Sequence, residues 1–292
     1  MTELDVSNNH VEGKSASALG FVLEDARCGL KNLKLSGCVL TDVGCGQIMS
    51  GICSNTTLQT LDLSCNAIGK SNSEELSAIG VSEHATMRGG ANLSGGFAIA
   101  RMLCTNKHLT SLDLGWNAVR KDSAAAIACA LGAPHGAAKI ALHRAGEIPT
   151  GGPPLVSPCP LKSLSLAQNA LGRDGALNLA AALRENEALT ALDVANNLID
   201  SVGSLALILA IKWNTALLHL VLSGNHLGQA GAQALAASLS TRHRRLEVLT
   251  SQCDTSSKSG SGEFDPHKPV GHYNLDLSKC VRVDFLHHAF VS

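Results

Sequence analysis

The sequence predicts an α/β solenoid, a stack of short parallel strands that alternate with helices. Three observations lead to this fold class. A motif of the form LxxLxLxxNxL recurs along the 292 residues, its copies are mostly about 28 residues apart, and a segment with helical periodicity follows most copies. Hydrophobic residues make up 45% of the chain but aromatic residues only 3%. The core must therefore be built from Leu, Ala, Val and Ile.

The strands are predicted at the LxL part of the motif. The clearest copy is LTALDVANNLI at residues 189–199. The motif recurs at 58–68, 109–119, 161–171 and 217–227, with a variant at 30–40 in which Cys38 replaces Asn, and with partial copies at 4–9, 246–251 and 275–277. Units of this kind bury their apolar faces only by stacking on their neighbours. The sequence predicts about nine or ten such repeats.

Two long steps interrupt the 28-residue period. Leu63 and Leu114 are 51 residues apart, and the Ser/Gly-rich stretch at about 70–93 indicates an inserted surface loop. The next step is 52 residues long and contains a second inserted loop at about 132–160, which is rich in Pro. Residues 137–148 within it are either a degenerate repeat without a helix or simply part of the insertion.

The two ends of the chain lead to different expectations. The repeat array is predicted to span 1–252, followed by a flexible polar loop at 253–270 and by a terminal strand and capping helix at 271–292. The chain opens inside a repeat, without an amphipathic cap. An open solenoid end exposes a strand edge and apolar core. We therefore expect either a truncated gene product or a partner that covers the N-terminal end.

The second half of each unit is predicted to be helical. Within 174–186, Ala176, Leu179, Ala180 and Leu183 fall at i, i+3, i+4 and i+7, which is one helical face. The same pattern recurs at 44–52, 95–103, 123–131 and 230–239. The repeated Asn can hydrogen-bond backbone groups inside the turn between strand and helix.

The 28-residue unit LxxLxLxxNxLxxxGxxxLxxxL resembles the leucine-rich repeats of the ribonuclease-inhibitor type, and the resemblance covers nearly the whole chain. It implies a curved horseshoe with parallel strands on the concave side and helices on the convex side. It also implies protein recognition, as in ribonuclease inhibitor, NOD-like receptors, the Ran GTPase-activating protein and many ciliary or cytoskeletal scaffolds. The motif is specific for the fold and poorly specific for function.

Several classes of function are excluded by composition and missing motifs. A net charge of -1 offers no field for nucleic acid, and no apolar run reaches the roughly 18 residues of a membrane span. The start lacks a signal peptide and the ten cysteines are scattered singly, so we expect a cytoplasmic protein with reduced thiols. Phosphate-binding, nucleophile-elbow and metal-ligand spacings are absent. The sequence predicts no enzyme, no metal and no cofactor.

The residues between the strand leucines are expected on the concave face, where a protein partner would bind. The candidate contact residues there are Asp5, Lys34, Asp62, Asp113, Asp193 and His219. The Asp row is either a frequent form of this repeat, solvated at no cost, or a selected acidic contact surface. Trp116 at the rim and Trp213 on the helix side are candidate anchors, because Trp is enriched among interface hot spots. The alternative is that neighbouring segments cover both rings, the 132–160 segment over Trp116 and the adjacent helix over Trp213.

The sequence thus favours a non-enzymatic interaction scaffold, a subunit of a larger assembly in the cytoplasm, the cytoskeleton or the ciliary axoneme. Two alternatives stay open. The first is a regulator of a small GTPase, with Arg120 or Arg173 supplying a cation for phosphoryl transfer. The second is a fragment of an innate-immune-type sensor.

Overall fold

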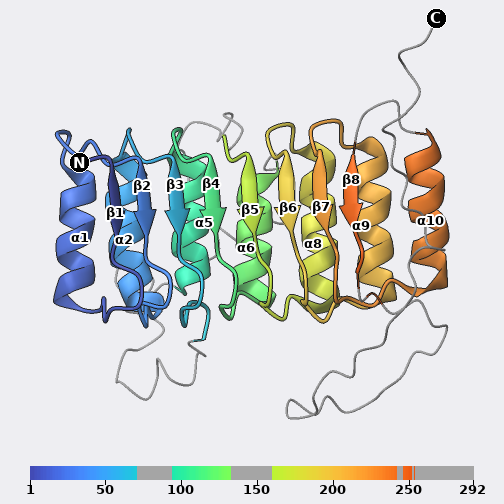
Figure 1. The fold of residues 1–292 in the computed structure, drawn as a ribbon, viewed down its shortest axis with the longest axis horizontal. Coiled ribbons are helices and arrows are strands. Elements are labelled where there is room, and N and C mark those ends of the chain that lie inside the picture. The colour runs from blue at the N-terminus through green and yellow to red at the C-terminus, as the bar shows by residue number, and fades with distance from the viewer. Residues whose placement is uncertain (71–93, 133–159, 242–245, 252, 254–292) are drawn as a thin grey trace, which may run out of the picture.

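The computed structural model describes residues 1–70, 94–132, 160–241, 246–251 and 253 (Figure 1). Within these residues, eight strands of three residues each form one parallel sheet in chain order. The strands are β1 (Glu3–Asp5), β2 (Asn32–Lys34), β3 (Thr60–Asp62), β4 (Ser111–Asp113), β5 (Ser163–Ser165), β6 (Ala191–Asp193), β7 (His219–Val221) and β8 (Glu247–Leu249). Residues 137–148, for which the sequence left open a degenerate repeat or an insertion, lie outside the described residues, as do the partial copy at 275–277 and the predicted capping helix.

All strands pair at the same position of the motif. The central residues Leu4, Leu33, Leu61, Leu112, Leu164, Leu192, Leu220 and Val248 stand opposite one another in successive strands. Side chains alternate between the two faces of a strand, so each central residue points into the core and its two neighbours point to the open face. The six inner leucines are accordingly buried, whereas the two outermost residues are only half-buried.

The helices follow the strands as the sequence predicts. They are α1 (Lys14–Glu24), α2 (Asp42–Ser54), α5 (Gly95–Thr105), α6 (Lys121–Leu131), α8 (Gly172–Glu185), α9 (Ser201–Trp213) and α10 (Gly228–Thr241). The helices expected at 44–52, 95–103, 123–131, 174–186 and 230–239 are confirmed, with ends that differ by one or two residues. None of the described helices is long and apolar enough to span a membrane.

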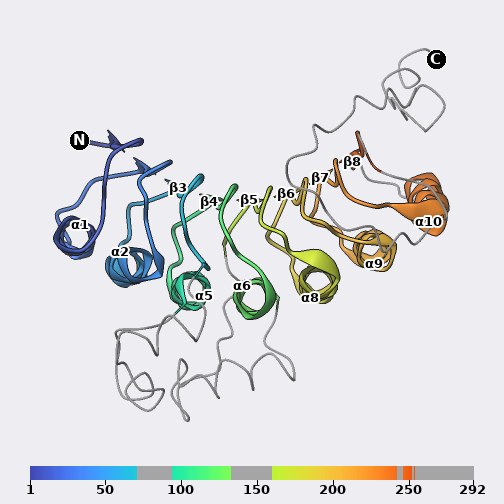
Figure 2. The ribbon, with the colours of Figure 1, turned by 90° about the horizontal axis from the view of Figure 1, so that it is seen from below.

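Seen from below, along the axes of its helices, the molecule is an arc with the strands on its inner side and the helices on its outer side (Figure 2). The curvature has a simple cause, because helices need more room side by side than strands, which lie about 4.8 Å apart. The core fills the space between the two layers. Leu61, Leu63 and Ile68 enter it from the sheet side, and Ile99 and Met102 from α5, all fully buried. The predicted α/β horseshoe is confirmed.

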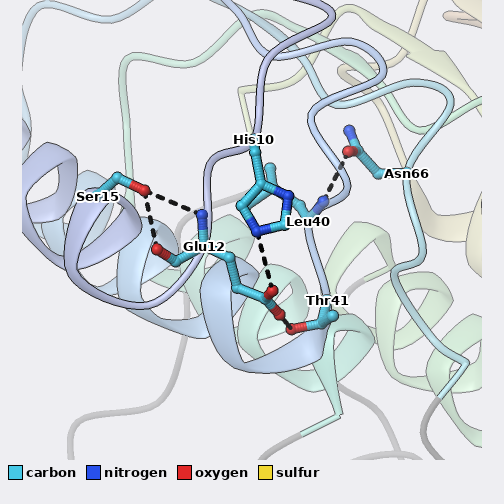
Figure 3. A network of polar contacts seen from close by, with 6 residues as sticks. All are labelled: His10, Glu12, Ser15, Leu40, Thr41 and Asn66. Carbon is cyan, nitrogen blue, oxygen red and sulfur yellow. Dashed lines mark hydrogen bonds and ion pairs between the residues drawn. The ribbon is translucent and has the colours of Figure 1, made fainter.

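The repeated Asn of the turn links successive repeats. Asn66, Asn117, Asn169, Asn197 and Asn225 each donate from Nδ2 to a carbonyl of the preceding repeat and to carbonyls of their own turn. Their Oδ1 atoms accept amides of the preceding repeat, as Asn66 does from Leu40 at 2.9 Å (Figure 3). Cys38 and Cys253 take the Asn position near the two ends, where Sγ donates to Val6 O and Leu222 O, both at 3.2 Å.

A second asparagine ladder, which the sequence analysis missed, runs along the helix ends. Asn55, Asn106, Asn186 and Asn214 directly follow α2, α5, α8 and α9 and are buried. Asn106 Nδ2 donates to Ile52 O and Asn55 O at 2.7 and 2.8 Å, while its Oδ1 accepts two amides of its own turn. The unpaired carbonyls that end a helix are satisfied in this way by the next repeat. The recurrence of Asn at this position was readable in the sequence.

The first turn shows how polar side chains join neighbouring repeats at the edge of the arc (Figure 3). Thr41 Oγ1 donates to Glu12 Oε1 at 2.9 Å, and His10 Nε2 lies 3.6 Å from Glu12 Oε2. Ser15 Oγ accepts the Glu12 amide and donates back to the Glu12 carbonyl. The Glu12 side chain therefore fixes the start of α1 to the residue before α2.

A buried carboxylate holds the chain on both sides of residues 71–93. Asp42 Oδ1 accepts the amide of Gly69 at 2.6 Å and the amide of Gly95 at 2.8 Å. Asp42 is 3% exposed and lies in the first turn of α2. The chain therefore leaves the repeat array and returns to it at nearly the same point, which explains how β3 and β4 keep their register across a long connection.

Candidate protein-binding surfaces

The floor of the concave face is formed by the first and third residues of each strand. Four of the third residues are the predicted Asp5, Asp62, Asp113 and Asp193. Each carboxylate accepts the backbone amide two residues further on, at 3.0, 2.9, 2.8 and 2.8 Å. Each carboxylate therefore closes the turn after its strand, and whether the row also forms a selected acidic contact surface stays a prediction.

The charges of this floor are unevenly distributed. Lys34 Nζ lies 3.6 Å from Glu3 and 3.8 Å from Asp5, so the β1–β2 end is a mixed ion cluster. Asp62 stands directly opposite Asp113 in the sheet register, with no basic residue on β3 to β6. The floor between β3 and β6 is therefore acidic.

Two pKa shifts reflect these surroundings. Burial raises the pKa of the Asp193 carboxyl, and the Asp113 carboxylate raises it further, although the Ala195 amide acts in the opposite direction. The hydrogen bonds from Ser7 lower the pKa of Asp5. The charge on Asp193 is thus unfavourable in the free protein, whereas the charge on Asp5 is favourable.

At the other end of the floor, His219 Nδ1 lies 3.1 Å from Glu247 Oε2, across the β7–β8 pair. Both side chains are exposed. A partner on the concave face could therefore reach this pair, and could also reach Lys34, which is about half exposed.

Trp116 stands at the rim of the floor, just after β4. Its side chain is 62% exposed, and its backbone adopts the left-handed conformation with φ of 56°. The same position is left-handed in other repeats as well, where it is occupied by Gly37 and Gly224 but also by Asn8, Cys65, Gln168 and Asn196, so this conformation belongs to the turn of the repeat. The hydrogen bond from the Trp116 amide to Ala167 O, at 2.8 Å, holds the backbone in place. What distinguishes Trp116 from these residues is its large exposed ring, which is typical of a binding residue.

Trp213 lies apart from the other seven candidates, on the convex side. It is the last residue of α9 and is 66% exposed. The Nζ of Lys212 lies 5.7 Å from the centre of its ring, within the range of a cation–π contact. The expectation that the adjacent helix covers this ring is wrong.

A hollow of about 410 Å³ opens on the convex side between α1, α2 and α5, a feature that the sequence did not predict. Phe21 and Val43 form part of its apolar wall. Arg101 and Gln47 line its polar part, and their buried Nε and Oε1 atoms have no hydrogen-bond partner among the residues that the structure describes. Gly46 also lines the hollow, and a Cβ at this position would meet nothing within 4 Å.

The two arginines considered for GTPase regulation differ in their surroundings. Arg173 Nε donates to Asp200 Oδ2 at 2.6 Å, so its guanidinium already has a carboxylate partner. Arg120 precedes α6 and is exposed. The structure gives neither of them an arrangement of neighbouring groups for phosphoryl transfer among the residues it describes.

Comparison with known proteins agrees with this architecture. The family model described as "Leucine Rich repeat" matches residues 1–20, 54–71, 105–128, 157–180 and 214–236. Ribonuclease inhibitor from Sus scrofa is 37% identical over 76 residues, which are 26% of this chain and 17% of the relative. Ribonuclease inhibitor from Mus musculus is 37% identical over 67 residues, or 23% of this chain and 15% of the relative.

A third relative is the NACHT, LRR and PYD domains-containing protein 14 of Mus musculus, which is 32% identical over 68 residues. This match covers 23% of the chain and 7% of the relative. The chain thus matches less than a fifth of the length of each of these relatives. The likeness concerns the repeats. With the matched motifs, the sheet register and the ladders in agreement, the chain is a leucine-rich repeat protein of the ribonuclease-inhibitor type.

Proposed function

We propose that this protein is a non-enzymatic interaction scaffold that holds a protein partner on its concave face. The observation that carries this proposal is Trp116, a large exposed ring on a left-handed backbone beside the open floor. The floor around it is nearly free of bulky side chains, since Gly115, Ala167 and Ala195 follow three adjacent strands. A partner can therefore approach the sheet closely and pack against the ring.

The charge of the floor favours one kind of contact. Asp62, Asp113 and Asp193 lie on a surface where no lysine or arginine of β3 to β6 neutralises them. A positively charged partner surface would relieve the repulsion between these carboxylates. The electrostatic attraction would also raise the rate of association. Lys34 and His219 bound this acidic area on either side and would set the register of the partner.

The test uses site-specific photo-crosslinking on the full chain in its native cell extract. A benzophenone amino acid replaces Ser165 on the concave floor or, as the matched control, Asn178 on the exposed side of α8. We expect a stoichiometric protein crosslink from position 165 that Trp116→Ala removes and Gln168→Ala leaves. A crosslink from 178 alone, or one from 165 that is unchanged by Trp116→Ala, would overturn the concave-face proposal.

The scaffold is further proposed to work inside a larger assembly of the cytoplasm, such as the cytoskeleton or a ciliary axoneme. Charged residues make up only 16% of the chain, which favours stable association with other proteins over existence as a free monomer. Fractionation of detergent-extracted cells measures this directly. Recovery in the insoluble cytoskeletal or axonemal fraction is expected, and recovery as a free monomer contradicts the assembly.

A further inference from the structure

The solvent-exposed side of helix α9 is more apolar than that of α8. Its exposed positions are Val202, Leu209, Lys212 and Trp213, so three of the four are large and apolar. The exposed residues of α8 are mostly polar, since Leu177 and Ala181 are accompanied by Arg173, Asp174, Asn178, Arg184 and Glu185. A helix that is apolar on all sides is usually buried. This one lies in the interior of the array, between α8 and α10 (Figure 2).

The three apolar residues form a straight row. Val202, Leu209 and Trp213 are related by i, i+7 and i+11, which places them within about 20° of one line along the helix. The half-buried Leu205 and Ala206 fill the turn between them. The row is about 16 Å long, or three helical turns. We call these five residues the α9 stripe.

The size and surface of the stripe limit what can cover it. A stable dimer needs about 20–30 residues on each side, far more than the stripe offers. The outer side of a helix has no free backbone groups, so an extended peptide would gain no backbone hydrogen bonds there, unlike a peptide added to a sheet edge. A helix satisfies its backbone internally and packs side chain against side chain. The dimensions therefore fit one short amphipathic helix.

The charges at the end of the stripe specify that helix further. Lys212 and Arg184 occupy equivalent positions of α9 and α8, 28 residues apart, and both are exposed. Neither forms an ion pair with any residue that the structure describes, although Lys212 lies over the Trp213 ring. Both cations stand at the carboxyl ends of their helices. An acidic side chain on the partner would pair with them.

We propose that the α9 stripe docks an amphipathic helix of a protein partner, about three turns long, with an acidic residue at the end that meets Lys212. This second docking surface deepens the proposed scaffold function, since it would let the protein hold one partner on the concave side and another on the convex side. The stripe also explains why a helix with almost no polar residues is tolerated at the surface.

The test titrates the full chain with a hydrocarbon-stapled peptide of about twelve residues, with leucines at i, i+4, i+7 and i+11 and glutamates at one end. The Trp116→Phe background leaves Trp213 as the only tryptophan, and its emission reports binding. We expect a saturable blue shift with one peptide per chain. Leu209→Asp should weaken binding roughly tenfold or more, because it places a charge in the centre of the stripe.

Two controls make the result specific. Asn178→Asp adds the same charge to the exposed side of α8 and should leave binding unchanged. Exchange of glutamate for lysine in the peptide should weaken binding several-fold. The Lys212→Glu/Arg184→Glu double variant should reverse this preference.

A peptide with scrambled leucine positions that binds equally well, or a blue shift that Leu209→Asp does not reduce, overturns the proposal. So does self-association of the full chain that Leu209→Asp abolishes, because a second copy would then be the occupant. Absence of any shift up to the solubility limit of the peptide has the same consequence. The concave crosslink from position 165 is measured separately in Leu209→Asp, so failure of one surface is distinguishable from failure of the other.

Discussion

Single side chains hold neighbouring repeats together in this protein. Asn197 is completely buried, and its side chain makes four hydrogen bonds. Its Nδ2 donates to Leu166 O at 2.8 Å and to Ala195 O at 3.1 Å. Its Oδ1 accepts the amides of Asn169 and Leu171 at 3.0 and 3.2 Å. One residue therefore satisfies backbone groups of two repeats where no sheet ladder reaches.

Replacing Asn197 by Ala should therefore be costly. The free energy of unfolding is expected to fall by about 3 kcal/mol, because buried donors and acceptors lose their partners. Urea denaturation followed by circular dichroism measures the loss. Asn178→Ala is the matched control, since Asn178 is exposed on α8 and its loss should change stability by less than about 0.5 kcal/mol. Equal effects of the two substitutions would contradict the role of the ladder.

We expect Trp116 to lower the free energy of unfolding of the protein without its partner. A left-handed conformation is unfavourable by roughly 1–2 kcal/mol for a residue with a side chain, and glycine avoids that cost at the expense of about 0.5–1 kcal/mol of chain entropy. Trp116→Gly should therefore leave stability unchanged or raise it by up to about 1 kcal/mol. Gln168→Gly, with φ of 59°, should behave alike in thermal melts. A clear loss of stability in Trp116→Gly would show that the ring contributes packing, and would remove the argument for strain.

The raised pKa of Asp193 predicts that the free energy of unfolding depends on pH. Its pKa is raised in the folded protein, so folding favours the protonated carboxyl, and the associated stability is present at low pH and lost as pH rises through the folded pKa. Asp193→Asn keeps an acceptor for the Ala195 amide but carries no charge. The variant should be more stable than the parent at pH 7, by less than about 1 kcal/mol because the group is only half-buried. The difference should shrink toward pH 3, and a pH-independent difference in urea midpoints would refute this account.

At the scale of whole elements, glycines set how closely the helices pack. A Cβ on Gly51 would overlap the backbone oxygen of Gly20 across the α1–α2 contact, whereas a Cβ on Gly46 meets nothing within 4 Å. Gly46 and Gly51 both lie within α2. The two helices can therefore approach each other only because Gly51 has no side chain.

This difference gives a matched pair of substitutions in one helix. Gly51→Ala should lower the free energy of unfolding by 2 kcal/mol or more, at about the cost of overpacking a core. Gly46→Ala should raise it by about 0.5–1 kcal/mol, because alanine has the higher helix propensity. Guanidinium denaturation of both variants is the measurement. Destabilisation by Gly46→Ala would mean that the hollow beside it is required for the fold.

The elements also show what the sequence could predict. Strands and helices followed from the spacing of Leu, Ala and Asn, because every repeat solves the same packing problem. The second asparagine ladder occupies equally regular positions, but it lies at the helix ends, outside the strand motif on which the prediction rested. The outward stripe of α9 could not be predicted, because periodicity is lost in a helix that is apolar all round. Trp116 could be placed at the rim, but its left-handed backbone and the turn-closing role of Asp62 and Asp113 required coordinates.

For the whole molecule, the repeat length and the junction at Asp42 lead to the same conclusion. Leu63 and Leu114 are 51 residues apart, and the 23 residues of 71–93 account for the difference from the 28-residue unit. The amides of Gly69 and Gly95 meet at one carboxylate oxygen, so the two ends of that segment are already side by side. The array from β3 to β4 is thus complete without it.

Deletion of 71–93 should therefore leave a single cooperative unfolding transition. Stability should be unchanged or raised by no more than about 2 kcal/mol, since closing a connection costs about 0.6 kcal/mol for each doubling of its length. The same deletion combined with Asp42→Ala should be destabilised by several kcal/mol, because two buried amides then lose their acceptor. Urea titrations in a Trp213→Phe background, in which fluorescence follows only Trp116 beyond the junction, together with far-ultraviolet dichroism provide the measurement. If the two probes separate after the deletion alone, the repeats on either side no longer fold together, and the connection is then part of what joins the two halves of the horseshoe.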